Sequence, residues 1–258
     1  MRKKNREFSR SSVMYIVFGI ALVGVMTLIG ASAFLGINYF IISGAEKYTP
    51  EEIIEASGLS QGNNLFYLNT QTVAQRIKKA LPYVDTVEIT RDFPDTLSIT
   101  VTESKAIAYV VFEGDTVIID SSGRVLERSN VSPGSFTGGT NKSLIEVRGV
   151  LISDAVVGSQ LKPELGVEQF VNAMKSVLIL MELEGIQDDV SYLDVSNINN
   201  IFFGYQGTFR IIVGGVGELR MKLSRLPSDI LKLQERYPNP RGVYNMTGEP
   251  DRYIFTPE

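Results

Sequence analysis

The sequence predicts an α+β protein: a single N-terminal transmembrane helix, a small domain in the order strand, helix, helix, strand, strand, and a mixed β-sheet domain with packed helices. Three observations predict it. A basic tail precedes a long uncharged run, two capped helices precede a pair of alternating strands, and the β-rich second half contains two helical patterns. The expected boundaries are a cytoplasmic tail at 1–12, a transmembrane signal anchor at 13–37, a first exterior domain at 38–104 and a β domain at 105–258.

The N-terminus predicts the membrane topology. Five basic residues stand against Glu7 in the first ten positions, and an uncharged run from Val13 to Ile42 follows. A bilayer core about 30 Å thick needs about 20 apolar residues in a helix, and a basic flank stays in the cytoplasm. The pattern predicts a single-pass type II protein of the cell membrane, with its bulk outside the cytoplasm.

Two alternatives to an uncleaved anchor remain. Ala31-Ser32-Ala33 resembles a signal-peptidase site, but the apolar stretch before it is longer than the h-region of a typical signal peptide, about 7 to 15 residues. The other alternative is a buried core helix, which the absence of a polar face disfavours.

Composition excludes several kinds of function. The tail contains five of the 25 basic residues but one of the 29 acidic residues. The rest of the chain therefore carries a net charge of −8, and nucleic-acid binding is not expected. The chain has no cysteine and no histidine, which removes disulfides, thiolate catalysis, the Ser-His-Asp triad and the usual zinc ligands. We therefore expect no enzyme, no metal site and no cofactor.

The first exterior domain begins with a predicted strand at 38–43, ended by Gly44. A helix follows, because Thr49 is a good N-cap, Pro50 fits the first helical position and Glu52 completes a capping box. Gly58 suits the left-handed residue after the helix.

A second helix and two strands complete this domain. Asn69 or Thr70 is expected to cap the helix after a turn at 61–64, and Pro82 to end it. Alternation in 87–91 and 97–101 then predicts a hairpin around the turn at 92–95.

The β domain starts with predicted strands at 106–112 and 116–120, joined by the turn Glu113-Gly114-Asp115. Asp120-x-x-Gly123 reads as a tight turn, and 130–141 as a loop. Further strands are expected in this order: 144–147, 190–195, 201–203, 209–213, 242–246 and 252–256.

Helical spacing predicts two helices in this domain. The first presents Val167, Phe170, Met174, Val177 and Met181, and the second presents Leu219, Leu223, Leu226, Ile230 and Leu233. Pro227 interrupts the second pattern, so packing with a kink on the domain's own sheet is favoured over a coiled coil.

Two features are candidates for binding a protein partner. The final strand would form a sheet edge open to strand addition, with Tyr253 and Phe255 on one face and Ile254 on the other. The second helix carries basic residues that could dock an acidic partner, with a solvated face as the alternative. The candidate partner-binding residues are Tyr244, Arg252, Tyr253, Ile254, Phe255, Arg220 and Arg225.

Two motifs resemble enzyme signatures but are incomplete. Gly214-Gly215-Val216-Gly217 lacks the Gly-Lys-Ser/Thr ending of a phosphate-binding loop and reads as a strand-to-helix turn. Ser159-Gln160-Leu161-Lys162 matches S-x-x-K, without the companion motifs of penicillin-binding proteins.

Several fragments in a fixed order behind the anchor resemble the FtsQ/DivIB family of bacterial cell-division proteins. They are Ser43-Gly44, Glu51-Glu52-Ile53, Ser57-Gly58-Leu59, Gly62-Asn63-Asn64-Leu65-Phe66, Arg76-Ile77, Val87-x-Ile89-x-Arg91-x-x-Pro94-x-x-Leu97-x-Ile99-x-Val101-x-Glu103, and Asp120-x-x-Gly123-x-Val125-Leu126. The chain departs from the family pattern at Ser104-Lys105-Ala106 and Tyr244-Asn245-Met246.

The resemblance implies that the first exterior domain is a POTRA domain and that the protein is a scaffold of the divisome at the septum. Its implied partners are small FtsB/DivIC-like and FtsL-like division proteins, and through them the septal penicillin-binding protein and its glycosyltransferase, so that septal peptidoglycan synthesis is regulated. Alternatives are a POTRA-type chaperone for exported polypeptides and a carboxylate-based cell-wall hydrolase or transpeptidase.

Overall fold

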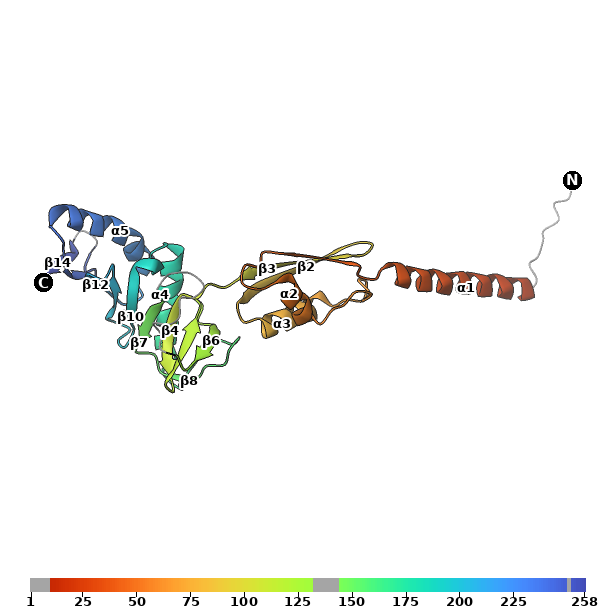
Figure 1. The fold of residues 1–258 in the computed structure, drawn as a ribbon, viewed down its shortest axis with the longest axis horizontal. Helices are drawn as coiled ribbons and strands as arrows, with labels where there is room; N and C mark the ends of the chain where they lie inside the picture. The colour runs from red at the N-terminus through yellow and green to blue at the C-terminus, as the bar shows by residue number, and fades with distance from the viewer. Residues whose placement is uncertain (1–9, 132–143, 250–251) are drawn as a thin grey trace. The chain divides into compact units, whose positions relative to one another are not determined.

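The computed structural model describes residues 10–131, 144–249 and 252–258 (Figure 1). The chain divides into two units, one of residues 1–78 and 86–103 and the other of residues 79–85 and 104–258. Most of the predicted loop at 130–141 lies outside the described residues. The predicted boundary between the exterior domains at 104/105 stays a prediction.

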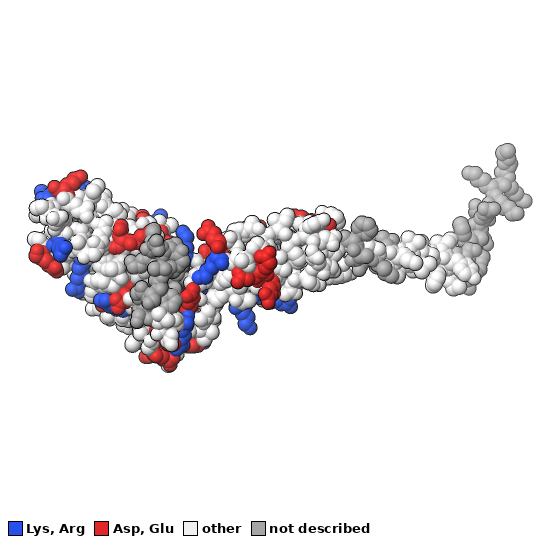
Figure 2. All heavy atoms as spheres, in the orientation of Figure 1, with Lys and Arg blue, Asp and Glu red and all other residues white. Residues whose placement is uncertain are grey.

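Helix α1 (Arg10–Phe34) is the first element of the chain. Its large apolar side chains between Met14 and Met26 are exposed, and apart from neighbouring residues of the helix itself no described atom lies within 4 Å of a Cβ built on Gly19 or Gly24. Figure 2 shows no charged side chain on the face of its described part that is in view. None of the helices in the described part of the chain combines the length and apolar character that crossing a membrane requires. The predicted transmembrane anchor therefore stays a prediction.

The rest of the first unit follows the predicted order of strand, helix, helix, strand, strand. Its elements are β1 (Tyr39–Ser43), α2 (Pro50–Ser57), α3 (Thr70–Ala80), β2 (Val84–Asp92) and β3 (Thr96–Glu103). The sheet has the order β1-β3-β2, and β1 runs parallel to β3 with Tyr39 opposite Thr96. The two helices cover one face of this sheet (Figure 1).

Local sequence rules account for both helix starts. The backbone N–H of Glu52 donates to the Thr49 side chain, and the Thr49 N–H donates to the Glu52 carboxylate at 2.8 Å, which completes the predicted capping box. Asn69 caps α3, because its Oδ1 accepts from the Thr72 N–H at 3.1 Å. Gly58 ends α2 in the left-handed conformation, with φ +67°.

The core of this unit forms between the central strand and the two helices. Leu97 and Ile99 of β3 are fully buried, as are Ile53 of α2 and Ile77 of α3. Alternation along β3 places its apolar residues on the helix side and its threonines on the other.

The second unit contains a nine-stranded mixed sheet. Its strands are β4 (Ala108–Phe112), β5 (Asp115–Ile119), β6 (Val125–Ser129), β7 (Ile145–Arg148), β10 (Val190–Asp194), β11 (Ile201–Tyr205), β12 (Phe209–Gly214), β13 (Gly242–Asn245) and β14 (Ile254–Pro257). Their order is β14-β13-β12-β11-β10-β7-β4-β5-β6, and β8 (Ile152–Asp154) pairs separately with β9 (Lys162–Pro163). The predicted mixed sheet is confirmed.

The described part of this unit also contains two long helices and a short 3-10 turn, η2 (Gln187–Asp189). Helix α4 (Glu168–Leu183) buries Met174, Val177 and Met181 as predicted, while Phe170 stays half-buried. Helix α5 (Leu219–Arg236) runs through Pro227 and buries Leu219, Leu223, Leu226 and Ile230 in the core of the same unit. Packing against the domain's own core is therefore confirmed; the kink at Pro227 stays a prediction.

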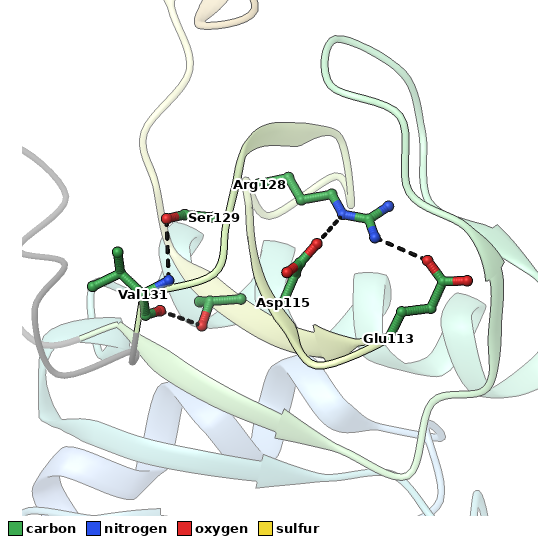
Figure 3. A network of polar contacts seen from close by, with 6 residues as sticks. Glu113, Asp115, Arg128, Ser129 and Val131 are labelled. Carbon is green, nitrogen blue, oxygen red and sulfur yellow. Dashed lines mark hydrogen bonds and ion pairs between the residues drawn. The ribbon is translucent and has the colours of Figure 1, made fainter.

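The β4–β5 hairpin closes with the predicted turn. Glu113 and Gly114 both have positive φ, +54° and +89°, between the paired residues Phe112 and Asp115, as in a two-residue hairpin of the I′ class. Arg128 of β6 binds both acids of this hairpin, with Nε 2.7 Å from Asp115 and Nη2 2.9 Å from Glu113 (Figure 3). These bonds raise the pKa of Arg128 and join β6 to the β4–β5 hairpin.

Candidate functional site

Strand β14 is one end of the nine-stranded sheet, and among the described strands it pairs with β13 alone. The strand begins at Ile254, two residues later than the sequence predicted, because Arg252 and Tyr253 precede the ladder. Tyr244 lies opposite Phe255 and Asn245 opposite Ile254. The predicted sheet edge is confirmed with a shorter strand.

The hydrogen bonds determine which amides of β14 face outward. The Glu258 N–H donates to the Arg241 carbonyl oxygen at 3.0 Å, toward β13, whereas the Gly242 N–H donates to Thr208, toward β12. Backbone groups alternate in direction along a strand, so the amides of Ile254 and Thr256 also face β13 and the amide of Phe255 faces away. Pro257 has no N–H to offer, as is common on edge strands.

The side chains of the terminal segment alternate as predicted. Tyr253 and Phe255 pack partly buried against the core, while Ile254 is 62% exposed. The Phe255 ring lies 5.5 Å from that of Tyr237 and 6.1 Å from that of Phe209, centroid to centroid. Of this segment's apolar side chains, Ile254 is the exposed one that a partner could contact directly.

Helix α5 contributes to the same surface. The Tyr244 hydroxyl donates to Asp229 Oδ2 at 3.1 Å, and the Arg225 guanidinium lies 4.0 Å from that carboxylate. The Tyr253 ring meets the Tyr244 ring edge-on at 6.1 Å and lies 5.8 Å from the Arg225 guanidinium carbon. The structure thus joins four predicted residues and Asp229 into one cluster, which we call the terminal cluster: Tyr244, Arg225, Tyr253, Phe255 and Asp229.

Asp229 is the member of this cluster that the sequence reasoning missed. It is 9% exposed and also lies 3.5 Å from Lys232. Burial, and then the Asp229 charge, raise the pKa of Tyr244, so the hydroxyl stays protonated and donates to the carboxylate. The signal was present, because Asp229 stands three residues after Leu226 and so falls on the apolar stripe of the helix.

Three of the seven predicted residues lie apart from the terminal cluster, and one of them is Ile254, whose side chain is on the exposed face of β14. Arg220 Nε is 3.5 Å from Glu184, the residue that ends α4. Arg252 is 3.8 Å from Glu249, and both of these side chains are about four-fifths exposed (81% and 78%). Surface pairs of this kind contribute about 0 to 1 kcal/mol.

The two enzyme-like motifs have structural explanations. Gly214 ends β12 with φ +74°, and the following residues turn into α5, as predicted. Lys162 binds Asp154 at 2.8 Å and lowers the pKa of that carboxyl group, so its amine has a structural partner in the β8–β9 pair.

A separate shallow hollow of about 310 Å³ lies in the first unit. Leu59, the loop before α3 and the first two turns of that helix line it. Among the residues that the structure describes, Arg76 is the one charged residue in its lining, and no acidic residue lines it. The sequence reasoning did not identify this hollow.

Comparison with known proteins identifies relatives for both units. The family model for the FtsQ-type POTRA domain matches residues 35–104. The chain is 27% identical over 240 residues to cell division protein DivIB of Clostridium tetani, covering 92% of this chain and 86% of that protein. It is also 27% identical over 254 residues to DivIB of Clostridium botulinum, covering 98% and 94%. Cell division protein FtsQ of Corynebacterium glutamicum is 28% identical over 116 residues, 43% of this chain and 51% of that protein. The resemblance read from the sequence motifs is thereby confirmed.

Proposed function

The chain contains an FtsQ-type POTRA domain and is homologous to DivIB and FtsQ proteins, and from this premise we propose that it acts in bacterial cell division as a non-catalytic scaffold. The names of the relatives support the division role. The absence of histidine and cysteine from the sequence supports a role without catalysis, because it removes the commonest general base and nucleophile.

The scaffold is anchored by α1 in the cell membrane at the septum, with its N-terminus in the cytoplasm. The basic tail and the uncharged run that follows support this topology. The large apolar side chains along α1 support it further, because the protein leaves them exposed. A bilayer would bury this apolar surface, which is unfavourable in water.

The partner is a small bitopic division protein of the FtsB/DivIC or FtsL kind, and it binds by adding a strand to β14. Through it the scaffold regulates the septal penicillin-binding protein and its glycosyltransferase. The single observation that carries this mechanism is the open edge of β14, where the Phe255 amide faces away from the sheet. Ile254 is exposed beside it and supplies an apolar contact.

A photo-crosslinking residue at Ile254, in the full-length protein in living cells, tests this function. We expect capture of a small bitopic division protein, and much weaker capture from Leu165, which is 98% exposed but lies outside the sheet. Recovery of many unrelated exported polypeptides would instead support a chaperone.

A pair of variants at Phe255 isolates the backbone contribution. With the crosslinker at Ile254, Phe255→Ala and Phe255→Pro both remove the ring, but only proline removes the outward N–H. We expect Phe255→Pro to abolish capture and Phe255→Ala to retain part of it. Equal capture by the two variants would contradict strand addition at this edge.

A further inference from the structure

The loop between α2 and α3 has an unusual composition. The sequence from Ala56 to Gln75 contains no charged residue, although 21% of the chain is charged. Within this stretch Phe66 is 64% exposed and Tyr67 is 76% exposed, and their rings meet edge-on at 5.4 Å. Leu65 beside them is fully buried, so the loop is fixed to the core while its two aromatic rings face outward.

Backbone hydrogen bonds attach this loop to the segment that leaves α1. The Leu65 N–H donates to the Leu35 carbonyl oxygen, the Ile37 N–H to that of Asn63, and the Gly62 N–H to that of Ile37, each at 2.8 Å. Since α1 ends at Phe34, the loop is held one to three residues beyond the end of the helix.

The β2–β3 turn lies at the same end of the domain. The N–H groups of Asn38 and Tyr39 both donate to the Asp95 carbonyl oxygen, at 2.8 and 3.2 Å. Arg91 Nη2 donates to the Leu68 carbonyl oxygen at 2.5 Å, which joins the hairpin to the loop. Phe93 at the tip of this turn is 55% exposed, so it adds a third outward ring to this end of the domain.

We propose that this end of the POTRA domain rests on the membrane, with Phe66, Tyr67 and Phe93 inserted among the lipid headgroups. The proposal rests on the membrane anchor of the proposed function. The 22 residues from Val13 to Phe34 form about 33 Å of helix, which matches a hydrocarbon core of about 30 Å and brings Leu35 to the headgroup level.

The chemistry of this end fits a lipid surface better than water. Tyr67 has the kind of ring that is favoured at the membrane interface, where the ring contacts acyl chains and the hydroxyl stays hydrated. Phe66 and Phe93 are apolar, and contact with acyl chains removes their exposed rings from water.

The uncharged stretch itself contributes no carboxylate to this surface. Asp92 and Asp95 flank Phe93, and their carboxylates accept hydrogen bonds from Ser98 and from Asn38 and Thr96. The hollow next to Tyr67 also lacks carboxylates, because Arg76 is the one charged residue among its described lining residues.

Depth-dependent fluorescence quenching in lipid vesicles tests the proposal on the full-length protein. The chain has no cysteine, so single substitutions carry the fluorophore without further changes. The reporter is Gln71→Cys, exposed in the first turn of α3. Val17→Cys reports on the anchor itself. Thr102→Cys is the matched control. Thr102 lies about 20 Å along β3 from Thr96, which directly follows the β2–β3 turn that would face the membrane.

We expect strong quenching of the Gln71 reporter by nitroxides on the lipid headgroups, and several-fold weaker quenching at Thr102. Phe66→Ser combined with Tyr67→Ser should reduce quenching at Gln71 toward the Thr102 level, whereas Val111→Ser, at an exposed apolar residue of the second unit, should not.

The Val17 reporter separates the two proposals. Quenching at Val17 by nitroxides deep in the acyl chains, together with equally weak quenching at Gln71 and Thr102, would overturn the surface contact and leave the anchor intact. No quenching at Val17 would overturn the anchor, and the surface contact with it.

Discussion

Two buried tyrosines of the second unit each donate their hydroxyl group to a carboxylate. Tyr205 lies 3.2 Å from Asp189 Oδ2, and Tyr244 lies 3.1 Å from Asp229 Oδ2. Burial, reinforced by the Asp189 charge, raises the pKa of Tyr205 to about 12. The pKa of Tyr244 is raised for the same two reasons, with Asp229 as the charge.

The raised pKa of Tyr205 predicts a loss of stability in alkali. The unfolded chain releases this proton near pH 10, while the folded protein keeps it until about pH 12, so the contribution is complete below pH 10 and disappears as the pH rises to about 12. We expect Tyr205→Phe to flatten the decline of the unfolding free energy across this window, by an amount on the order of 2 kcal/mol. Denaturant unfolding at a series of pH values measures it.

Tyr67→Phe is the matched control for this substitution, because its ring is 76% exposed. This variant should keep the wild-type decline. An identical decline in Tyr205→Phe would show that the buried hydroxyl does not control alkaline stability.

At the scale of single elements, α2 and α5 show how local rules succeed and fail. In α2, Thr49, Pro50, Glu52 and Gly58 each occupy the position that capping rules assign to them. In α5, Pro227 breaks the rule against proline inside a helix, yet the helix continues to Arg236. Burial of Leu223, Leu226 and Ile230 explains the difference, since tertiary packing outweighs one lost backbone hydrogen bond.

This explanation predicts that Pro227→Ala stabilises the protein. Pro227 is exposed, so alanine removes little packing and restores a backbone donor. We expect the unfolding free energy to rise by about 1 to 3 kcal/mol, measured by denaturant unfolding. Pro50→Ala is the control, because proline at the first helical position costs no hydrogen bond and its replacement should change stability little.

A decrease in stability for Pro227→Ala would contradict this account. It would mean that α5 needs the local geometry of proline to reach its packing partners.

At the scale of the whole molecule, residues 79–85 belong to the second unit although they lie within the span of the POTRA domain. The Tyr83 hydroxyl donates to Glu127 at 2.5 Å, Arg124 Nη1 donates to the Val84 carbonyl oxygen at 2.9 Å, and the Ser104 N–H donates to that of Tyr83 at 2.7 Å. Tyr83 and Val84 are buried by these contacts. A domain boundary drawn at a single residue therefore cuts through a structural unit.

Tyr83→Phe tests this organisation. We expect the loss of a buried hydrogen bond to a carboxylate to cost about 1.5 to 3 kcal/mol in the second unit. Amide exchange along β6, which contains Glu127, should accelerate in hydrogen–deuterium exchange. Tyr39→Phe, at a ring that is 64% exposed in the first unit, should leave β6 unchanged. Unchanged exchange in Tyr83→Phe would show that residues 79–85 do not stabilise this strand.

The sequence by itself determined what depends on neighbouring residues. The helix start at Thr49, the hairpin turn at Glu113 and Gly114, and the alternation of Tyr253, Ile254 and Phe255 were all predicted, because caps, turns and strand periodicity are set within a few residues. For the second helix the sequence left Asn69 and Thr70 as alternative caps, and the structure has Asn69. The motifs of the first exterior domain also predicted its match to the FtsQ-type POTRA domain.

Only the tertiary structure decided which distant residues meet. It separated Arg220 from the terminal cluster and brought Asp229 into it, directed the Phe255 amide outward, and attached the loop at 62–65 to residues 35–37. These outcomes depend on sheet order and on contacts between segments far apart in the chain. Such contacts form only after long loops close, and no pattern within a short stretch of sequence encodes which segments will be joined.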